Sequence, residues 1–225
     1  MISFIIPALD EAESLPRTLG ALGAFLDPSE EIVVVDGGSR DGTRDVASRF
    51  GRVIESPRGR ARQMNAGARA ARGKLLVFAH ADTTFSKEAL GELRSVAGDD
   101  RAHWGFFPVL LDAEGLGYRT IELGIRIRVA LGGCATGDQA IFVRRSTFLA
   151  VGGYRDVPLM EDVELTRLLR RWLEPVRPRT AVTTSARRWS RRGVARTQLR
   201  MWALRLAWRL GVPHEVLAGH YPVVR

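Results

Sequence analysis

Cysteine is almost absent from this chain of 225 residues, since Cys134 is the only one. A single cysteine excludes an intrachain disulfide and any metal site that needs two thiolates from the chain. Such sparse use of cysteine is typical of proteins that work in a reducing compartment. We therefore expect a cytoplasmic protein.

Long apolar runs are absent as well. No uninterrupted apolar stretch approaches the roughly 20 residues that span a bilayer, and residues 1–7 read as a strand rather than as a signal peptide. The sequence has no internal repeat. No Gly-x-Gly-x-x-Gly pattern follows the first expected strand, which disfavours an oxidoreductase that binds a dinucleotide.

Acidic residues are outnumbered, with 25 Asp and Glu against 34 Lys and Arg and a formal net charge of +9. This excess favours a polyanionic partner: a phosphate ester, a nucleic acid or an anionic membrane surface. The hydrophobic content of 45% and the charged content of 26% are those of an ordinary folded protein with a sizeable core. We expect one domain that spans residues 1–225.

Short apolar segments alternate with helical segments in the first part of the chain. Strands are expected at 2–8, 31–36, 52–55 and 75–79, with helices at 14–26, 43–50 and 63–71 between them. This alternation predicts an α/β fold with a Rossmann-like, mostly parallel sheet and helices on both faces. Farther along, helices are expected at 87–96, 117–131, 146–151, 159–172 and 193–210, and strands at 104–111, 140–144 and 180–184.

Three expected strands are followed by an aspartate: Asp10, Asp36 and Asp82. The carboxyl ends of parallel strands share one edge of a sheet, so these acids should converge there, beside the basic loop at 58–62. In an extended segment His80 would point to the same side as Asp82, and the pair could hold a divalent cation. The alternative, in which each acid only caps a helix or closes a turn, stays open.

Six short motifs follow one another along the chain. They are Ile5-Ile-Pro7-Ala-Leu-Asp10-Glu11, Val33-Val-Val-Asp36-Gly-Gly-Ser39-Arg-Asp41-Gly42-Thr43, His80-Ala-Asp82, Gly137-Asp138-Gln139, Met160-Glu161-Asp162 and Arg187-Arg188-Trp189. In this order and spacing they resemble the family 2 glycosyltransferases of the GT-A fold. The length and the His-Ala-Asp motif further resemble a small bacterial subgroup of transferases associated with radical-SAM or selenium-domain proteins.

The resemblance implies an inverting, non-processive transfer of a sugar from a nucleotide-diphosphate donor, of the UDP or GDP type, to an unidentified acceptor hydroxyl. It divides the chain into a nucleotide-binding half (1–100), an acceptor and catalytic half (101–192) and a C-terminal amphipathic helix and tail (193–225). The chain departs from the family at His80, where an aspartate is usual, and at Ser185, where processive members have a glutamine.

The resemblance also assigns roles to individual residues. The donor would be held by Pro7, Asp10, Glu11, Asp36, Arg60, Arg62, Asp82 and Arg188. Mn²⁺ or Mg²⁺ would be bound by Asp82, with His80 as a second ligand. Asp162, with Glu161 beside it, would be the catalytic base, and Asp138, Gln139 and Trp189 would lie near the sugar or the acceptor.

The expected helix at 193–210 has an apolar stripe of Leu199, Trp202, Leu206 and Leu210 and carries several arginines. Such a helix can lie on an anionic membrane, as a peripheral contact with its inner face. It can equally pack on the body of the protein or on a second subunit in a homodimer, and we favour packing over membrane contact.

Two other functions stay open at this point. A nucleotidyltransferase of related fold would also use acids at strand ends, although its usual Gly-rich, Lys- or Arg-bearing signature is missing. A non-catalytic protein that binds nucleotides or nucleic acid would explain the positive charge. We expect no nucleic-acid partner, because the sequence contains no recognised nucleic-acid module.

Overall fold

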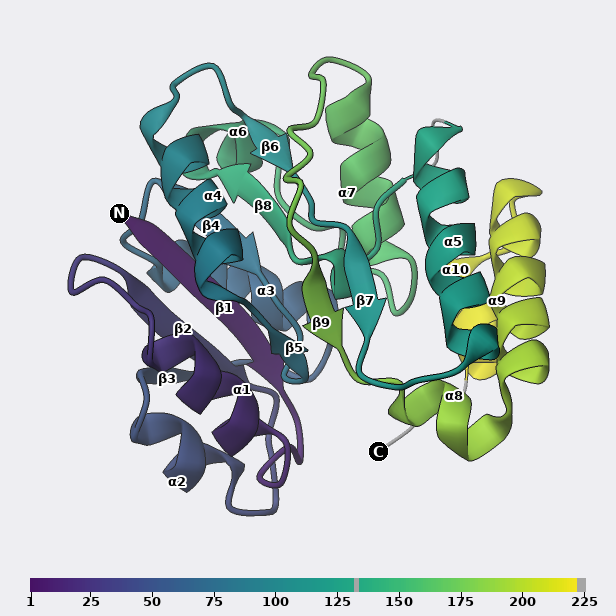
Figure 1. Cartoon of the computed structure of the whole chain (residues 1–225), viewed down its shortest axis with the longest axis horizontal. Coiled ribbons are helices and arrows are strands. Elements are labelled where there is room, and N and C mark those ends of the chain that lie inside the picture. The colour runs from purple at the N-terminus through teal and green to yellow at the C-terminus, as the bar shows by residue number, and fades with distance from the viewer. Residues whose placement is uncertain (132–133, 222–225) are drawn as a thin grey trace.

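The computed structural model describes residues 1–131 and 134–221, so the end of the expected C-terminal tail lies outside the described residues. The described chain forms a six-stranded sheet and a three-stranded sheet that lie beside each other (Figure 1). The larger sheet has the order β3-β2-β1-β4-β8-β6. Its strands are β1 (Ile2–Ala8), β2 (Glu31–Asp36), β3 (Arg52–Glu55), β4 (Leu75–Phe78), β6 (Trp104–Gly105) and β8 (Ile141–Arg144).

The first four strands of the larger sheet are parallel, and β8 runs antiparallel to β4. The smaller sheet has the order β5-β9-β7. Its strands are β5 (Thr83–Thr84), β7 (Val109–Leu111) and β9 (Val182–Thr184). The predicted mostly parallel α/β architecture is therefore confirmed.

Helices cover both faces of the larger sheet and form a separate group beside the smaller one (Figure 1). They are α1 (Leu15–Gly23), α2 (Thr43–Ser48), α3 (Arg60–Ala70), α4 (Lys87–Gly98), α5 (Leu116–Ala130), α6 (Arg145–Ala150), α7 (Glu161–Arg170), α8 (Arg187–Arg192), α9 (Val194–Arg209) and α10 (His214–Gly219). A 3₁₀ turn, η1, spans Gly137–Gln139.

The central strand β1 is buried on both faces. Phe4 and Ile6 pack in the core that contains α1 and α4, whereas Ile5 packs in the core that contains α3. Successive side chains of a strand point to opposite faces, so a strand covered on both sides needs a continuous apolar run. Since Ala8 pairs with Asp36, the ends of β1 and β2 lie at the same edge of the sheet.

The strand expected at 104–111 is wrong as a single element. It is split into β6, which joins the larger sheet, and β7, which joins the smaller one. Gly105 allows the close approach in β6, because an added Cβ there would lie 2.2 Å from the carbonyl oxygen of Val176. The helices α8 and α10 and the short strand β5 were not expected from the sequence.

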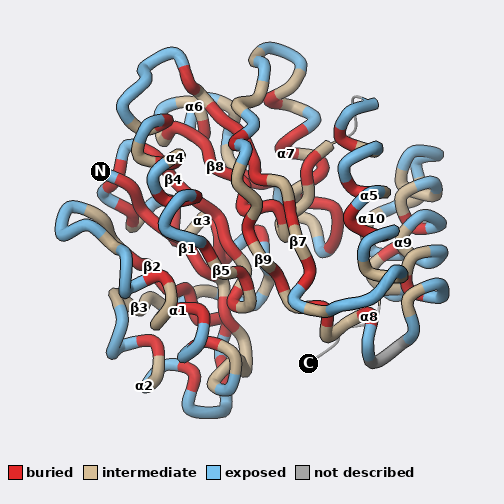
Figure 2. The backbone as a smooth tube through the Cα atoms, in the orientation of Figure 1, coloured by how far each residue is buried: buried red, intermediate tan, exposed pale blue. Residues whose placement is uncertain are grey.

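The predicted helix at 193–210 exists as α9, but its apolar stripe does not pack as expected. Leu199, Trp202, Leu206 and Leu210 are all exposed. The helix nevertheless packs on the rest of the protein through another face, where Leu204 is buried in a cluster with Val163 and Leu217. Much of the outer side of α9 has the colour of exposed residues in Figure 2. Within the described ranges, every helix falls short of the length and apolarity that crossing a bilayer requires.

Candidate active site

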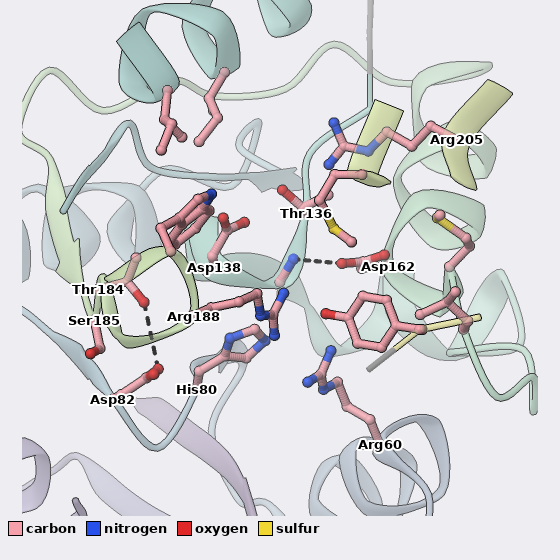
Figure 3. Close-up of a pocket in the computed structure, with 18 of the residues that line it drawn as sticks. Arg60, His80, Asp82, Thr136, Asp138, Asp162, Thr184, Ser185, Arg188 and Arg205 are labelled. Carbon is pink, nitrogen blue, oxygen red and sulfur yellow. Dashed lines mark hydrogen bonds between the residues drawn. The ribbon is translucent and has the colours of Figure 1, made fainter. Parts of the chain in front are cut away.

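One cavity collects polar residues from the last four of the six motifs (Figure 3). It lies where the end of β4, the turn η1 and the starts of α7 and α8 meet the helices α5 and α9. Its polar and charged lining residues include Arg60, His80, Asp82, Arg128, Thr136, Asp138, Glu161, Asp162, Thr184, Ser185, Arg187, Arg188, Trp189, Gln198, Arg205 and Tyr221. Residues that are far apart in the sequence thus share one chamber.

Asp162 lies in the first turn of α7, where the positive end of the helix dipole stabilises a carboxylate. Its Oδ2 accepts a hydrogen bond from the backbone N–H of Gly137 at 2.7 Å, and its Oδ1 accepts one from the N–H of Val163 at 2.7 Å. Each carboxylate oxygen has two lone pairs, so each can accept one further hydrogen bond. Asp162 can therefore receive a proton from a group in the cavity.

Left-handed backbone conformations surround this site. Met160, directly before α7, has φ +67°, and Ala140, directly after η1, has φ +43°. A third such residue, Asp10 with φ +54°, lies outside the cavity, in the loop after β1. Each such residue costs about 1–3 kcal/mol, and such strain is found preferentially at functional sites. Met160 is the N-cap residue of α7, so its unusual conformation sets where Glu161 and Asp162 enter the cavity.

Glu161, which is buried, lies beside the half-exposed side chain of Arg60 in the cavity. Their atoms Oε1 and Nη1 are 3.5 Å apart, and Glu161 is only 3% exposed. Burial, and next the charge of Asp162, raise the pKa of Glu161, while Arg60 opposes the shift. Burial lowers the pKa of Arg60, but Glu161 and the other nearby acidic groups raise it more, so the guanidinium stays charged.

His80 faces η1. Its Nε2 is buried without a hydrogen-bond partner among the described residues, and an added Cβ on Gly137 would lie 2.5 Å from it. Burial, with the positive charges of Arg60 and Arg188, lowers the pKa of His80 to about 3, although Asp138 acts in the opposite direction. The imidazole is therefore neutral at physiological pH.

Asp82 lines the same cavity as His80, although residues 81 and 82 form a turn rather than an extended strand. Figure 3 shows the Asp82 carboxylate beside Thr184, whose hydroxyl donates to Oδ1 over a long 3.5 Å. Burial, and next Glu11, raise the pKa of Asp82, while Arg187 and Arg188 lower it. The carboxylate is thus only weakly hydrogen-bonded within the described chain.

These contacts decide how well a divalent cation fits. No group of three His, Cys, Asp or Glu residues that could hold a metal occurs in the described part of the chain. Mg²⁺ and Mn²⁺ at diphosphate sites commonly use one or two carboxylates, with phosphate oxygens as the other ligands. Asp82 fits that requirement. The Nε2 of His80 is packed against Gly137, so its ligation of a cation stays a prediction.

Asp138 and Gln139 have different surroundings. Asp138 lines the cavity, and its Oδ1 is buried without a partner among the described residues. Gln139 is buried behind the cavity wall, where its side-chain oxygen accepts from Arg128 at 2.9 Å and its amide donates to the carbonyl of Phe107 at 3.2 Å. Gln139 therefore positions Arg128 rather than facing the cavity.

The opposite wall comes from α8 and the segment after α10. Arg187 lies 3.8 Å from Glu11, which links α8 to the loop after β1. The guanidinium of Arg188 lies over the ring of Tyr221, 5.1 Å from its centroid. Trp189 lines the cavity, with its indole Nε1 buried and unpartnered among the described residues.

Several predicted donor-binding residues do not line this cavity. Asp36 is 1% exposed, and its carboxylate accepts the backbone N–H groups of Gly38 and Ser39. Arg62 forms an ion pair with Asp156 at the surface. Pro7, Asp10 and Glu11 lie at the edge where β1 ends and are likewise outside the lining.

The structure adds Arg128, Thr184, Arg205 and Tyr221 to the site, none of which was expected. These residues lie on α5, on β9, on α9 and after α10, so only the folding of the second half brings them to the motif residues. Positive charge on the two helices was visible in the sequence. No spacing pattern indicated which arginines turn inward.

Comparison with known proteins gives a consistent result. The model of the family described as glycosyl transferase family 2 matches residues 3–141. A PGL/p-HBAD biosynthesis glycosyltransferase of Mycobacterium bovis is 29% identical over 164 residues, which cover 68% of this chain and 63% of that protein. The chain thus spans less than two thirds of the length of this relative.

Two solved structures have a similar fold. One is S. aureus TarS 1–349 in complex with UDP-GlcNAc, with a TM-score of 0.66, 16% identity, and coverage of 83% of this chain and 58% of that chain. The other is the mannosyltransferase PcManGT from Pyrobaculum calidifontis in complex with GDP-Man and Mn²⁺, with a TM-score of 0.66 and 18% identity. That likeness covers 100% of this chain and 65% of PcManGT.

Proposed function

The chain belongs to glycosyl transferase family 2 and has the GT-A fold, and from this premise we propose that it is an inverting, non-processive glycosyltransferase. It would move a sugar from a nucleotide-diphosphate donor to an acceptor hydroxyl. The observation that carries this proposal is that Asp162 and Asp82 line one cavity together with Arg60 and Arg188. A base, a potential metal ligand and cations for a diphosphate are thus within one chamber.

Asp162 acts as the general base in this proposal. As the acceptor oxygen attacks the anomeric carbon, the bond from that carbon to the diphosphate oxygen breaks, and the electron pair leaves with the nucleoside diphosphate. The acceptor proton moves to Asp162, whose oxygens each have a lone pair left beside the hydrogen bonds from Gly137 and Val163. Attack opposite to the leaving group inverts the anomeric centre.

The departing diphosphate gains negative charge, and the cavity supplies positive charge for it. Arg60 and Arg188 both line the chamber, and Arg60 is held in its charged state by the acids around it. A divalent ion bound by Asp82 would neutralise the same charge when present. The likeness to a mannosyltransferase in complex with GDP-Man and Mn²⁺ supports Mn²⁺ or Mg²⁺ as that ion.

The nucleoside would lie at the edge where β1 and β2 end. Pro7, Asp10, Glu11 and Asp36 lie there, and carboxylates can accept hydrogen bonds from ribose hydroxyls and from the N–H of uracil or guanine. Asp36 would act chiefly by holding its turn in shape, since its oxygens already accept backbone hydrogen bonds. Asp138 and Trp189 would contact the sugar or the acceptor, and we propose a cytoplasmic location at the inner face of the membrane.

A thermal-shift panel tests this proposal. The protein is heated with UDP, GDP, CDP, ADP or dTDP, each with Mn²⁺, with Mg²⁺ and with EDTA. A ligand that binds only the folded protein raises the midpoint with its saturation. We expect a shift with UDP or GDP that EDTA reduces. No shift with any nucleotide, together with a shift caused by RNA, would contradict the proposal.

A further inference from the structure

Two adjacent helices expose an apolar stripe each. On α5 the stripe is Leu116, Leu123, Ile127 and Leu131, and on α9 it is Leu199, Trp202, Leu206 and Leu210; these side chains are between 49% and 86% exposed. In both helices the spacing of three, four or seven residues puts the side chains on one face. Single exposed apolar residues are ordinary, whereas a row of them along one helix face marks a candidate interaction surface.

A groove runs between these two helices, which lie side by side in Figure 1. Trp202 and Leu206 line the groove from α9 and belong to the exposed stripe as well. Gly124 and Ile125 line it from α5, and Val163 of α7 contributes to its lining. The exposed apolar surface of α9 therefore continues into the groove.

The groove joins the candidate active site. Ile125, Arg128, Gln198 and Arg205 line both the groove and the cavity that contains Asp162. A molecule that lies in the groove can therefore reach the proposed base without leaving the protein surface. Nucleotide binding, in contrast, was proposed for the opposite side of the cavity, where β1 and β2 end.

Two arginines stand at this junction without a carboxylate partner. Within the described ranges, neither Arg128 nor Arg205 forms an ion pair, and the Nε of Arg128 is buried without a hydrogen-bond partner. Figure 3 shows the Arg205 guanidinium extending from α9 toward Thr136. Burial, and next the charge of Arg205, lower the pKa of Arg128 to about 10, although the charges of Asp138 and Asp162 act in the opposite direction. An anion in direct contact with both guanidinium groups would add the ion pair that neither arginine has within the described ranges.

From the apolar groove and the paired arginines at its inner end, we infer that the acceptor is an anionic amphiphile. Its apolar chain lies between α5 and α9, and its phosphate or similar anionic group contacts Arg128 and Arg205. The hydroxyl that receives the sugar then lies in the cavity with Asp162. This inference rests on the proposed function, because it names the acceptor class of the same site.

Binding of alkyl phosphates tests the inference without any sugar donor. Butyl, hexyl and octyl phosphate, each below its micellar concentration, are titrated by calorimetry into the full chain, with octyl glucoside as the neutral comparison. Each fully buried methylene strengthens binding about fourfold, so octyl phosphate should bind at least about tenfold tighter than butyl phosphate. Octyl glucoside should bind at least about tenfold more weakly than octyl phosphate.

Matched variants distinguish the ionic contact of the anionic group from the apolar contact of the chain. Arg205→Gln should weaken the binding of octyl phosphate about tenfold and leave the gain in affinity per added methylene unchanged. Arg196→Gln, which changes an exposed arginine of α9 outside the groove, should leave the affinity unchanged. Leu206→Asn should reduce the gain per methylene. Its control is Leu149→Asn on α6, which is 56% exposed against 59% for Leu206.

Three results would overturn the inference. These are equal binding of octyl phosphate and octyl glucoside, the same affinity for all chain lengths, and a stable dimer in sedimentation that Leu206→Asn dissociates, since a second copy would then cover the stripes. The nucleotide thermal-shift panel is independent of these measurements. A metal-dependent UDP or GDP shift without alkyl phosphate binding removes this inference alone, whereas loss of the nucleotide shift removes the proposed function.

Discussion

The backbone nitrogen of Gly137 lies 2.7 Å from Oδ2 of Asp162, and Nε2 of His80 lies on the side of the same glycine where a Cβ would stand. One residue thus fixes the distance between the proposed base on α7 and the end of β4. A side chain at this position would lie 2.5 Å from His80 and 3.5 Å from Asp162. The positions of His80 and Asp162 therefore both depend on the absence of a side chain at Gly137.

Gly137→Ala should reduce kcat strongly while the protein stays folded. The added methyl group forces His80 or the turn η1 to move, and misplacement of a catalytic group by about 1 Å can cost about 100-fold in rate. Overpacking of this kind also costs about 1–3 kcal/mol of stability. Steady-state kinetics together with urea unfolding measure the two effects.

Gly91→Ala is the matched control, because nothing lies within 4 Å of a Cβ at that position in α4. It should leave kcat unchanged and stabilise the protein by about 0.5–1 kcal/mol, as replacement of a glycine inside a helix usually does. A wild-type kcat in Gly137→Ala would show that the contact with His80 does not constrain catalysis.

Asp162→Asn should abolish transfer but leave nucleotide binding nearly intact. Asparagine keeps the shape and one acceptor oxygen but cannot take the acceptor proton, and a general base contributes about 10²–10⁴-fold to the rate. The dissociation constant of UDP or GDP and the kcat are measured on the same preparation. Glu164→Gln is the control, since Glu164 lies on the same helix but pairs with His214 at 3.5 Å, outside the cavity. Retained transfer in Asp162→Asn would exclude Asp162 as the base.

Asp82→Asn should remove the effect of metal on nucleotide affinity. The amide keeps the size of the side chain but not the charge that a hard cation requires. We expect the affinity of the variant for UDP or GDP to be equal with Mn²⁺ and with EDTA, whereas the wild type should lose affinity in EDTA. Asp156→Asn, which changes a surface partner of Arg62, should behave as wild type. An unchanged metal effect in Asp82→Asn would rule out this ligand.

The first half of the fold could be predicted from local pattern, because β1, β2 and β4 consist mainly of apolar residues. Such runs arise when both faces of a parallel strand are covered, as the packing of Phe4 and Ile5 in opposite cores shows. The acids after β1, β2 and β4 could be predicted for the same reason. An acid that ends or follows a parallel strand in the sequence also lies at the carboxyl edge of the sheet.

The second half depended on contacts that no short pattern encodes. The split of 104–111 into β6 and β7 follows from Gly105 meeting the carbonyl of Val176, which is 71 positions away. His80 and Asp82 were expected on one side of an extended segment, and they do line one cavity, although residues 81–82 form a turn. Arg128 and Arg205 enter the cavity only because α5 and α9 pack together.

The pH dependence of stability offers a test of the Glu161 environment. Burial, and next Asp162, raise the pKa of Glu161 above the value near 4.5 of the unfolded chain, although Arg60 opposes the shift. A carboxyl group whose pKa is higher in the folded state binds a proton more readily there. Its contribution to the free energy of unfolding is therefore complete below pH 4.5 and is lost as the pH rises through the folded pKa.

Glu161→Gln is uncharged at every pH and should remove this loss. Between pH 4.5 and the folded pKa, the wild type should lose up to about 1.4 kcal/mol of stability per pH unit relative to the variant. Urea unfolding from pH 4.5 to 8 measures this difference, and Glu174→Gln, an exposed glutamate, should follow the wild type. Parallel curves for the wild type and Glu161→Gln would mean that Arg60 compensates the buried charge fully. In that event Glu161 would be ionised in the folded protein, and Asp162 would work beside a second negative charge.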